Sequence, residues 1–332
     1  MNIHHLLRSS RSIMLYLLKG KVPFSVTLDL THRCTGNCVF CQIQSDVYEE
    51  MSTEQVRTAI DQFHSLGTSR MAFTGGDVLL REDLGELIRH AVSKGLFVSV
   101  NSNGNLAVKR SDLISQADMI VFSLDGDPEH HVQTKQGTNP ELILEAIRQA
   151  KGRGQSVSTI TVLTSKNLDS VTWIMETGRR MGFAVTFQPV LRCDMSPDLA
   201  LEWEPSPEDL KRTTELIIAW AKKGYPVMNS NRYLRMVGEA KYKPKDGSPP
   251  CAAGRFYCTV LPDGSVVPCH CAYKRTAFLN GNDVGFDRAF LDMPEFTCQG
   301  CLSTAYTELD LIAKGHPGLA FRAMRLLFGS SA

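Results

Sequence analysis

Short runs of apolar and β-branched residues alternate along the chain with segments whose apolar positions recur at helical spacing. Strands are predicted at residues 24–30, 70–74, 97–101, 119–124, 157–163 and 184–190. Several of these runs are continuously apolar or β-branched, which is typical of parallel strands that are buried on both faces. Strands that alternate with helices through right-handed crossovers form a parallel α/β sheet. Six such units, rather than eight, predict an open, partial (βα)6 TIM-like barrel.

Helix start signals lie between these strands. Ser52 and Gln55 match a capping box, in which the two side chains satisfy backbone N–H groups of the first helical turn. Asn-Pro at 139–140 and Ser-Pro at 206–207 each put proline at the first helical position, where its missing N–H costs no hydrogen bond. The first two signals support helices between the predicted strands, and the one at 206–207 supports a helix after the last of them.

A polar segment rich in proline and glycine, residues 241–250, interrupts this pattern. Behind it the cysteines become dense and the regular periodicity is lost. We therefore expect a basic amphipathic segment at 1–22, the partial barrel at 23–240, a linker at 241–250, a small cysteine-rich domain at 251–310 and a C-terminal helix at 311–332.

Composition narrows the class of protein. The chain has 332 residues, of which 43% are hydrophobic, enough for one large domain or one large and one small domain. A net charge of +1 gives no indication of nucleic-acid binding. Ten cysteines in a long chain without a signal peptide favour a reducing, cytoplasmic compartment and metal ligation over disulfides. No segment reaches the roughly 18 uninterrupted apolar residues of a transmembrane helix.

Both ends of the chain are apolar and basic. No acidic residue precedes Asp29, and residues 321–328 combine phenylalanine and leucine with two arginines. Basic amphipathic helices can lie on anionic membrane surfaces, so one interpretation is a peripheral membrane contact. The favoured interpretation is two terminal helices that pack on the domain with their arginines in water.

The loop behind the first strand carries the strongest chemical signal. Cys34, Cys38 and Cys41 form a C-x3-C-x2-C run. Three thiolates on one short loop can hold three corners of a four-iron cluster and leave one iron open for a ligand. A zinc site or a ferredoxin-type cluster would need four ligands in or near the run. The alternative is half of a zinc site whose fourth ligand lies elsewhere.

The loops that follow the next three strands are polar and mostly contain glycine. They are Thr-Gly-Gly-Asp at 74–77, Asn-Ser-Asn-Gly at 101–104 and Ser-Leu-Asp-Gly at 123–126. Because parallel strands end at the same edge of a sheet, these loops and the cysteine loop gather at one end of the barrel, where chemistry is expected. This arrangement is typical of an enzyme rather than of a structural protein.

The cysteine spacing, the strand before it and Phe40 ahead of the third cysteine resemble the radical S-adenosylmethionine (SAM) superfamily. The resemblance implies that Cys34, Cys38 and Cys41 bind a [4Fe-4S] cluster whose open iron chelates the amino and carboxylate groups of SAM. One electron from the reduced cluster then cleaves SAM to a 5′-deoxyadenosyl radical, which abstracts hydrogen from an organic substrate. We assign no catalytic residue beyond these groups.

The same resemblance implies which residues hold SAM. Gly75 and Gly76 let the backbone approach the methionine end of SAM, and Asp77 accepts from its ammonium group. In the superfamily this motif usually ends in Glu and continues with proline, where this chain has Val78. The other implied contacts are Asn101 and Asn103 to the methionine carboxylate or ribose, Ser123 and Asp125 to the ribose, and Phe40 to adenine.

Two histidines, His130 and His131, follow the fourth strand closely. Either could donate or accept a proton near neutral pH. For both we favour a position on the surface.

The second region offers four further thiols. Cys251 and Cys269 flank a Pro-Asp-Gly turn at 262–264 between two β-prone runs, and a hairpin would bring both within reach of one metal centre. Cys298 and Cys301 add a later C-x2-C pair. Four thiolates in this arrangement make a tetrahedral zinc site or a fully ligated iron–sulfur cluster, which spacing alone does not separate.

The order of Cys251, Gly264, Cys269 and a later C-x2-C resembles the auxiliary-cluster extension of the SPASM/Twitch subgroup of radical SAM enzymes. The resemblance implies that one auxiliary [4Fe-4S] cluster is bound, as in the shorter Twitch form, because no cysteine follows Cys301. Its implied ligands are Cys251, Cys269, Cys298 and Cys301. Cys271 could replace Cys269 as a ligand, and we expect Cys193 and Cys258 to be buried thiols.

These features predict a radical SAM enzyme of the oxidoreductase or biosynthetic maturase type, reduced by an external electron donor such as flavodoxin or ferredoxin. Its substrate is a small molecule, a lipid or a peptide. About two dozen residues precede the first strand, too few for a leader-recognition domain, which disfavours a leader-dependent peptide. The basic, apolar ends slightly favour an amphiphilic substrate. The alternative is a non-catalytic electron-transfer protein or a zinc-stabilised scaffold, which leaves the polar loops unexplained.

Overall fold

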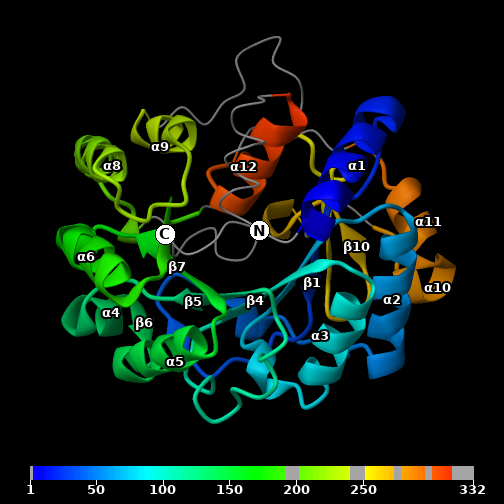
Figure 1. The fold of residues 1–332 in the computed structure, drawn as a ribbon, viewed down its shortest axis with the longest axis horizontal. Helices are drawn as coiled ribbons and strands as arrows, with labels where there is room; N and C mark the ends of the chain where they lie inside the picture. Colours follow the sequence, from blue (N-terminus) through cyan, green and yellow to red (C-terminus); the bar gives the residue numbers. More distant parts are fainter. Residues whose placement is uncertain (1–2, 192–201, 240–250, 273–277, 296–300, 316–332) are drawn as a thin grey trace.

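A computed structural model of the protein describes residues 3–191, 202–239, 251–272, 278–295 and 301–315. The predicted linker 241–250 and most of the predicted C-terminal helix lie outside this part. All six predicted strands are present and run parallel in one sheet (Figure 1). In sheet order they are β1 (Ser25–Asp29), β3 (Arg70–Thr74), β4 (Phe97–Ser102), β5 (Met119–Ser123), β7 (Ser156–Leu163) and β8 (Ala184–Pro189).

The sheet continues past β1 with a hairpin from the cysteine-rich region. β9 (Tyr257–Val260) pairs parallel with β1, and β10 (Val266–Val267) pairs antiparallel with β9 around the turn at 262–264. The predicted hairpin is therefore present, and it belongs to the barrel sheet. This pairing carries the flanking residues of the hairpin to the edge of the barrel beside the strand that precedes the cysteine loop.

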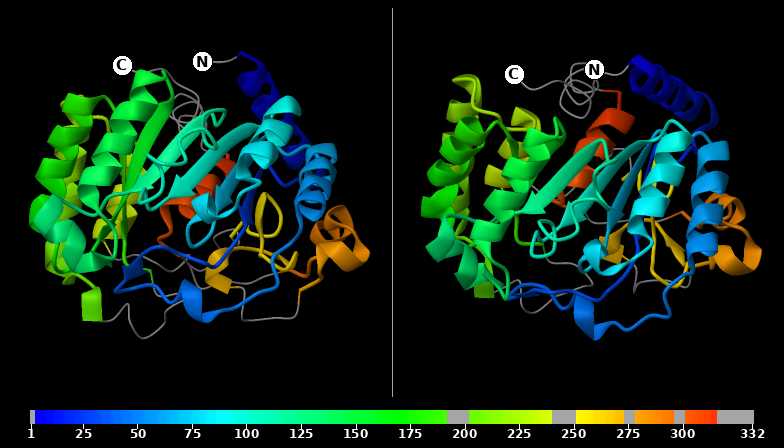
Figure 2. Two further views of the ribbon diagram at one scale, coloured as in Figure 1. Left: turned by 90° about the horizontal axis from the view of Figure 1, so that it is seen from below. Right: turned by 60° about the horizontal axis from the view of Figure 1, so that its bottom comes forward.

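Helices cover the outer side of the sheet, where they follow one another in chain order (Figures 1 and 2). The predicted start signals are confirmed, since Ser52 and Gln55 form a capping box and Asn139 and Ser206 are N-caps. The described α-helices from residue 53 to residue 291 are α2 (Thr53–Ser65), α3 (Leu84–Ser93), α4 (Pro128–Thr134), α5 (Pro140–Gly152), α6 (Val171–Met181), α8 (Pro207–Lys222), α9 (Asn231–Gly238), α10 (Gly281–Val284) and α11 (Phe286–Leu291). The short 3-10 helices are η1 (Ile43–Ser45), η2 (Val78–Leu80), η3 (Leu168–Ser170) and η4 (His270–Ala272).

The two faces of the sheet differ in polarity. Val26, Leu28 and Phe73 are fully buried in the core between the sheet and the outer helices. The residues that alternate with them, such as Ser25 and Thr27, line a cavity inside the barrel. The strands were expected to be buried on both faces, but their inner face lines a cavity instead. The reason is that the barrel is open and its interior is not a packed core.

Two further helices close the barrel. α12 (Thr304–Ala313) lies opposite the outer helices, near α1 (Ile3–Lys19) (Figure 1). Arg8 of α1 donates to the carbonyl of Thr68 at 2.8 Å, and Ser9 shares a hydrogen bond of 2.7 Å with Ser69. These contacts lie at the amino ends of the strands, so α1 covers the end of the barrel opposite the polar loops.

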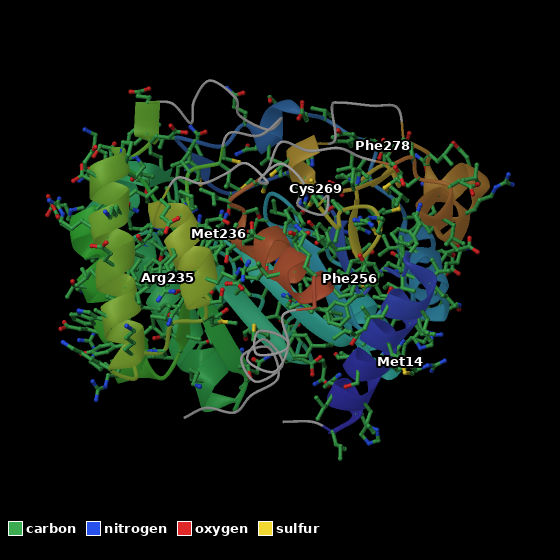
Figure 3. All side chains as sticks on the ribbon, turned by 90° about the horizontal axis from the view of Figure 1, so that it is seen from above. Met14, Arg235, Met236, Phe256, Cys269 and Phe278 are labelled. Carbon is green, nitrogen blue, oxygen red and sulfur yellow. The ribbon has the colours of Figure 1, made fainter. Side chains whose placement is uncertain are left out.

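α1 packs on the domain, as expected, but with a largely polar side inward. Its buried residues are His5, Ser9, Ser12 and Tyr16. The outward side carries exposed apolar residues, namely Ile3, Leu7, Met14, Leu17 and Leu18. Figure 3 shows α1 with Met14 at the rim of the molecule. None of the described helices is long and apolar enough to cross a membrane.

Candidate active site

The cysteine loop leaves the carboxyl end of β1. Cys34, Cys38 and Cys41 carry free, partly exposed thiols. Cys38 belongs to β2 (Asn37–Cys38), which pairs antiparallel with β6 (Lys135–Gln136), and the N–H of Cys41 donates to the carbonyl of Cys38 at 3.1 Å. The segment after α4 therefore holds the loop from its far side.

Hydrogen-bond donors face the sulfur atoms of this loop. The N–H of Gly36 and the Nδ2 of Asn103 lie 3.4 and 3.5 Å from Cys34 Sγ. Burial raises the pKa of Cys41 to about 11, so this thiol keeps its proton at neutral pH unless a metal replaces it. Among the described residues, no three His, Cys, Asp or Glu side chains converge on a single metal ion. In a four-iron cluster each cysteine binds a different iron, and three free thiols with donors to sulfur fit such a cluster.

A buried lysine adds positive charge to the loop. Lys135 Nζ lies 3.9 Å from Cys38 Sγ, 3.6 Å from a carboxylate oxygen of Asp125 and 5.0 Å from the centre of the Phe40 ring. Burial alone would lower the pKa of Lys135, but Asp125 and the neighbouring thiols raise it above the ordinary value. The ammonium group therefore stays charged, and it favours the thiolate form that Cys41 takes when it binds a metal.

Asp125, a predicted ribose contact, is fully buried. Its carboxylate accepts hydrogen bonds from the N–H of Val162 at 2.9 Å and from the hydroxyl of Thr134 at 3.2 Å, besides facing Lys135. Burial raises the pKa of Asp125 above its ordinary value. In this structure Asp125 anchors Lys135, and its contact with ribose stays a prediction.

The expectation of a surface position is wrong for His131, which is fully buried. Its Nδ1 accepts from the N–H of Asp125 at 3.1 Å, because α4 turns the ring inward beneath the loop after β5. Burial lowers the pKa of His131 to about 3, so the ring is neutral. His130 is partly exposed and bonds Asp127.

Gly75 and Gly76 hold the cysteine loop at close range. The N–H of Gly76 donates to the carbonyl of Thr31 at 2.7 Å, and the N–H of Asp77 donates to that of Arg33 at 2.8 Å. A Cβ atom on either glycine would collide with those same carbonyls. The missing side chains therefore let the backbone approach the cysteine loop. Gly75 also lines the cavity, so its predicted contact with the methionine end of SAM stays a prediction.

Asp77 and Asn103 bind protein groups in this structure. The Asp77 carboxylate accepts from Ser102 Oγ at 3.0 Å, Thr35 Oγ1 at 3.1 Å and the N–H of Leu79 at 3.3 Å. Asn103 Nδ2 donates to Thr35 Oγ1 at 3.0 Å. Both side chains thus tie the cysteine loop to the polar loops of β3 and β4. Their direct contacts with SAM stay predictions.

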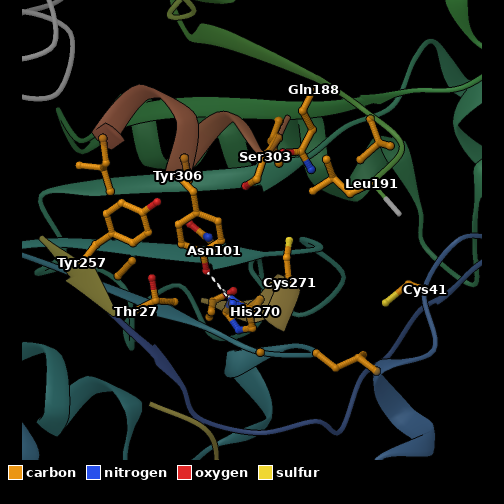
Figure 4. Close-up of a pocket in the computed structure, with 18 of the residues that line it drawn as sticks. Thr27, Cys41, Asn101, Gln188, Leu191, Tyr257, His270, Cys271, Ser303 and Tyr306 are labelled. Atoms are coloured by element: carbon orange, nitrogen blue, oxygen red, sulfur yellow. Dashed lines mark hydrogen bonds between the residues drawn. The ribbon is translucent and has the colours of Figure 1, made fainter. Parts of the chain in front are cut away.

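A cavity of about 310 Å³ opens between the cysteine loop and the second region (Figure 4). Four residues with predicted roles in the cluster and SAM site line it, namely Phe40, Cys41, Gly75 and Asn101. The second region contributes Tyr257, His270, Cys271 and Tyr306. Ser123, at the end of β5, is partly exposed outside this lining. The cavity therefore joins the predicted SAM site to the cysteine-rich region.

Sequence reasoning missed a polar cluster that reaches the cavity wall at His270 and Tyr306. Asp29 is fully buried and bonds His32 at 3.0 Å and His270 at 3.1 Å. His270 Nδ1 lies 2.8 Å from the hydroxyl of Tyr306 (Figure 4). Burial would raise the pKa of Asp29, but the bonds from both histidines outweigh it and lower the pKa. The Asp29–Leu30–Thr31–His32 run is visible in the sequence, but its link to His270 spans 241 residues.

The thiols of the second region lie in different surroundings. Cys251 Sγ is 2.9 Å from the hydroxyl of Tyr257, and it packs in one small core with the buried Cys269. Burial raises the pKa of Cys251 to about 12. Cys301 Sγ accepts from the N–H of Ser303 at 3.1 Å just before α12. Cys258 is fully buried, as predicted, whereas Cys193 and Cys298 lie outside the described residues.

A parallel, partly open α/β barrel with three cysteines at the carboxyl end of its first strand defines the class. The model of the radical SAM superfamily matches residues 28–177. Residues 28–177 therefore form a radical SAM domain, and the chain is an enzyme that uses SAM and a [4Fe-4S] cluster.

Two curated relatives match most of the chain. The mycofactocin maturase MftC of Mycolicibacterium smegmatis is 24% identical over 278 residues, covering 81% of this chain and 70% of that protein. The PqqA peptide cyclase of Streptomyces rochei is 27% identical over 266 residues, covering 76% and 71%. The structure of Streptococcus suis SuiB bound to S-adenosylmethionine shares the fold, with a TM-score of 0.69 and 12% identity over 85% of this chain and 69% of that one. Both curated relatives are named as enzymes, and they do not favour the alternative of a non-catalytic metalloprotein.

Proposed function

We propose that this radical SAM enzyme modifies a peptide. The observation that carries the proposal is the cavity between the cysteine loop and the second region, which gives a substrate access to Cys41 and to the predicted SAM loop at Gly75. The names of two relatives, a maturase and a peptide cyclase, support a peptide over the small molecule or lipid that the sequence left open.

In this proposal Cys34, Cys38 and Cys41 hold the SAM-binding cluster. When bound and reduced, the cluster and SAM supply a carbon-centred radical that removes hydrogen from the substrate. The proposed SAM contacts are Phe40, Gly75, Gly76, Asp77, Asn101, Asn103, Ser123 and Asp125. Asp77, Asn103 and Asp125 would also keep the loops and Lys135 in position around SAM. An external one-electron donor such as flavodoxin or ferredoxin would reduce the cluster.

The second region is proposed to hold one auxiliary cluster through Cys251, Cys269, Cys298 and Cys301. The small core around Cys251 and Cys269 supports this, because it brings two thiols from either side of a hairpin together. A second cluster beside the cavity could accept an electron from the substrate after hydrogen removal.

The proposed function is tested with anaerobically reconstituted protein, SAM and dithionite, and a randomised peptide library. We expect 5′-deoxyadenosine to form, and to acquire deuterium when the library peptides are deuterated on carbon. Flavodoxin and ferredoxin replace dithionite in parallel reactions. Formation of 5′-deoxyadenosine that never carries deuterium from any peptide would contradict a peptide substrate.

We also propose that the outward side of α1 contacts anionic membrane surfaces. Leu7 and Leu18 are 62% and 77% exposed, and Arg11 and Lys19 accompany them on a helix without acidic residues. Apolar side chains with basic neighbours match the chemistry of an anionic lipid surface.

The test of this contact uses two leucines that can be changed without disturbing the packed side of α1. The wild-type protein should co-sediment with vesicles that contain phosphatidylserine, but little with pure phosphatidylcholine, and added salt should weaken the binding. Leu7→Glu combined with Leu18→Glu should lose it. Ser10→Ala, also on the exposed side, serves as the control. Equal sedimentation of the double variant and the wild type would disprove the contact.

A further inference from the structure

The inner face of the barrel contains an arginine far from the cysteine loop. Arg70 is the first residue of β3, and it lines the cavity together with Ala72 and Thr74 of the same strand. Arg70 and Thr74 are about 13 Å apart along β3, at about 3.3 Å per residue. Thr74 directly precedes the predicted SAM loop. A molecule that spans the cavity would therefore have one end near the cysteine loop and the other near Arg70.

Arg70 is poorly satisfied by the protein. Its Nη2 lies 3.5 Å from Ser99 Oγ, at the limit of a hydrogen bond. Its Nε is buried and has no hydrogen-bond partner among the residues that the structure describes. Burial lowers the pKa of Arg70 to about 10, and no carboxylate in the described ranges offsets that effect.

Another arginine shows how this chain normally treats a buried guanidinium. Arg81 is 6% exposed, and it forms hydrogen bonds of 2.9 and 2.6 Å with the two carboxylate oxygens of Asp83. It also donates to the carbonyl of Met51 at 2.9 Å. A buried charge without such partners is costly. Arg70 is partly exposed to the cavity, and its buried Nε has no such partner, so a ligand in the cavity can supply the counter-ion.

We propose that Arg70 binds a carboxylate of the substrate, at the end of the cavity away from the cysteine loop. The inference rests on the proposed peptide substrate and deepens it. A planar guanidinium recognises a carboxylate through two parallel hydrogen bonds, which a neutral amide cannot reproduce. The carboxylate belongs either to the C-terminus of the peptide or to an Asp or Glu side chain. The distance along β3 corresponds to roughly four extended residues between the bound carboxylate and the cysteine loop.

The test compares ligands that differ only in this group. A randomised tetrapeptide library is prepared once as free acids and once as C-terminal amides, and each is incubated with reconstituted holoenzyme and SAM. Bound peptides are identified by mass spectrometry. The wild type should retain free acids at least about tenfold over amides, the difference expected of a charge-assisted pair. In Arg70→Met and Arg70→Gln the ratio should fall to about one. Thr27→Val, a change to an uncharged residue in the same wall, should keep the wild-type ratio.

The outcomes separate the alternatives. Retention of amides only when they contain Asp or Glu, lost again in Arg70→Met, would assign the carboxylate to a side chain. The ligand-free Arg70→Met protein should also melt at a higher temperature, because a guanidinium with a buried, unpaired Nε is replaced by an apolar chain of similar length. No preference for carboxylates in the wild type, an unchanged preference in both variants, or a lower melting temperature in both would overturn the inference.

Failure of this inference is distinguishable from failure of the proposed function. The wild-type enzyme is assayed in parallel for 5′-deoxyadenosine with deuterated library peptides. Deuterium transfer without a preference for carboxylates would leave the proposed function standing and remove the role of Arg70. If no deuterium is transferred but free acids are clearly preferred, Arg70 binds a carboxylate and the proposed peptide modification is contradicted.

Discussion

A variant in which Cys34, Cys38 and Cys41 are all alanine is expected to form no 5′-deoxyadenosine from SAM above a protein-free control. The three thiols lie on one turn of chain at the carboxyl end of β1, and the polar groups around them point at sulfur. Without them the cluster that binds SAM has no ligands on this loop. The variant should still fold, because all three side chains are partly exposed and none belongs to the main hydrophobic core.

The measurement combines iron content, circular dichroism and product analysis after anaerobic reconstitution. Iron should fall by about four atoms per chain relative to the wild type. Cys258→Ala is the matched control, since it removes a thiol that is fully buried in the core and is not a predicted ligand of either cluster. It should keep its iron and its SAM cleavage. Reductive cleavage of SAM by the triple variant would show that the cluster site lies elsewhere.

The sequence was a good guide wherever a function depends on neighbours along the chain. The six parallel strands, the capping box at Ser52 and the hairpin turn at 262–264 are local patterns, and all are present. The cysteine triplet is also local, because one loop supplies all three thiols. For such features the order of residues is sufficient to predict the chemistry.

Side chains delivered from distant segments could not be predicted in this way. Lys135 reaches Cys38 through the pairing of β2 with β6, and His270 reaches Asp29 through the pairing of β9 with β1. Neither pairing has a signature in the run of residues around it. His131 was misplaced for a related reason, since its burial depends on how α4 meets the strands rather than on its immediate neighbours.

The polarity of the inner face is encoded in the alternation of residues along its strands. Ser25, Thr27 and Asp29 alternate with apolar residues along β1, which indicates a strand with one apolar and one polar face. In a closed barrel the inner residues form a packed core, whereas here Ser25 and Thr27 line a cavity. Arg70 follows the same alternation on β3. Alternation of polar and apolar residues within a parallel strand therefore indicates a cavity on the polar face of the strand.

Auxiliary-cluster loss is expected to be the second large effect. In Cys269→Ala, iron should fall from about eight to about four atoms per chain, while Cys271→Ala should keep about eight. Cys269 is buried in the small core against which Cys251 and Cys271 both pack, so it is held more firmly than Cys271. Cys271 is partly exposed and lines the cavity, where it can face the substrate. Iron and zinc are measured by plasma emission, and the clusters by electron paramagnetic resonance after reduction.

The result also separates the two metals that four thiolates can bind. Stoichiometric zinc with about four irons in the wild type would identify the second site as a structural zinc site. Loss of the second set of irons in Cys271→Ala alone would move the ligand from Cys269 to Cys271. Tyr257→Phe, which removes the hydroxyl 2.9 Å from Cys251 Sγ, is the control for packing and should retain both clusters. If it does, the iron lost in Cys269→Ala reflects a missing ligand, because a disturbed core would release iron from the Tyr257 variant as well.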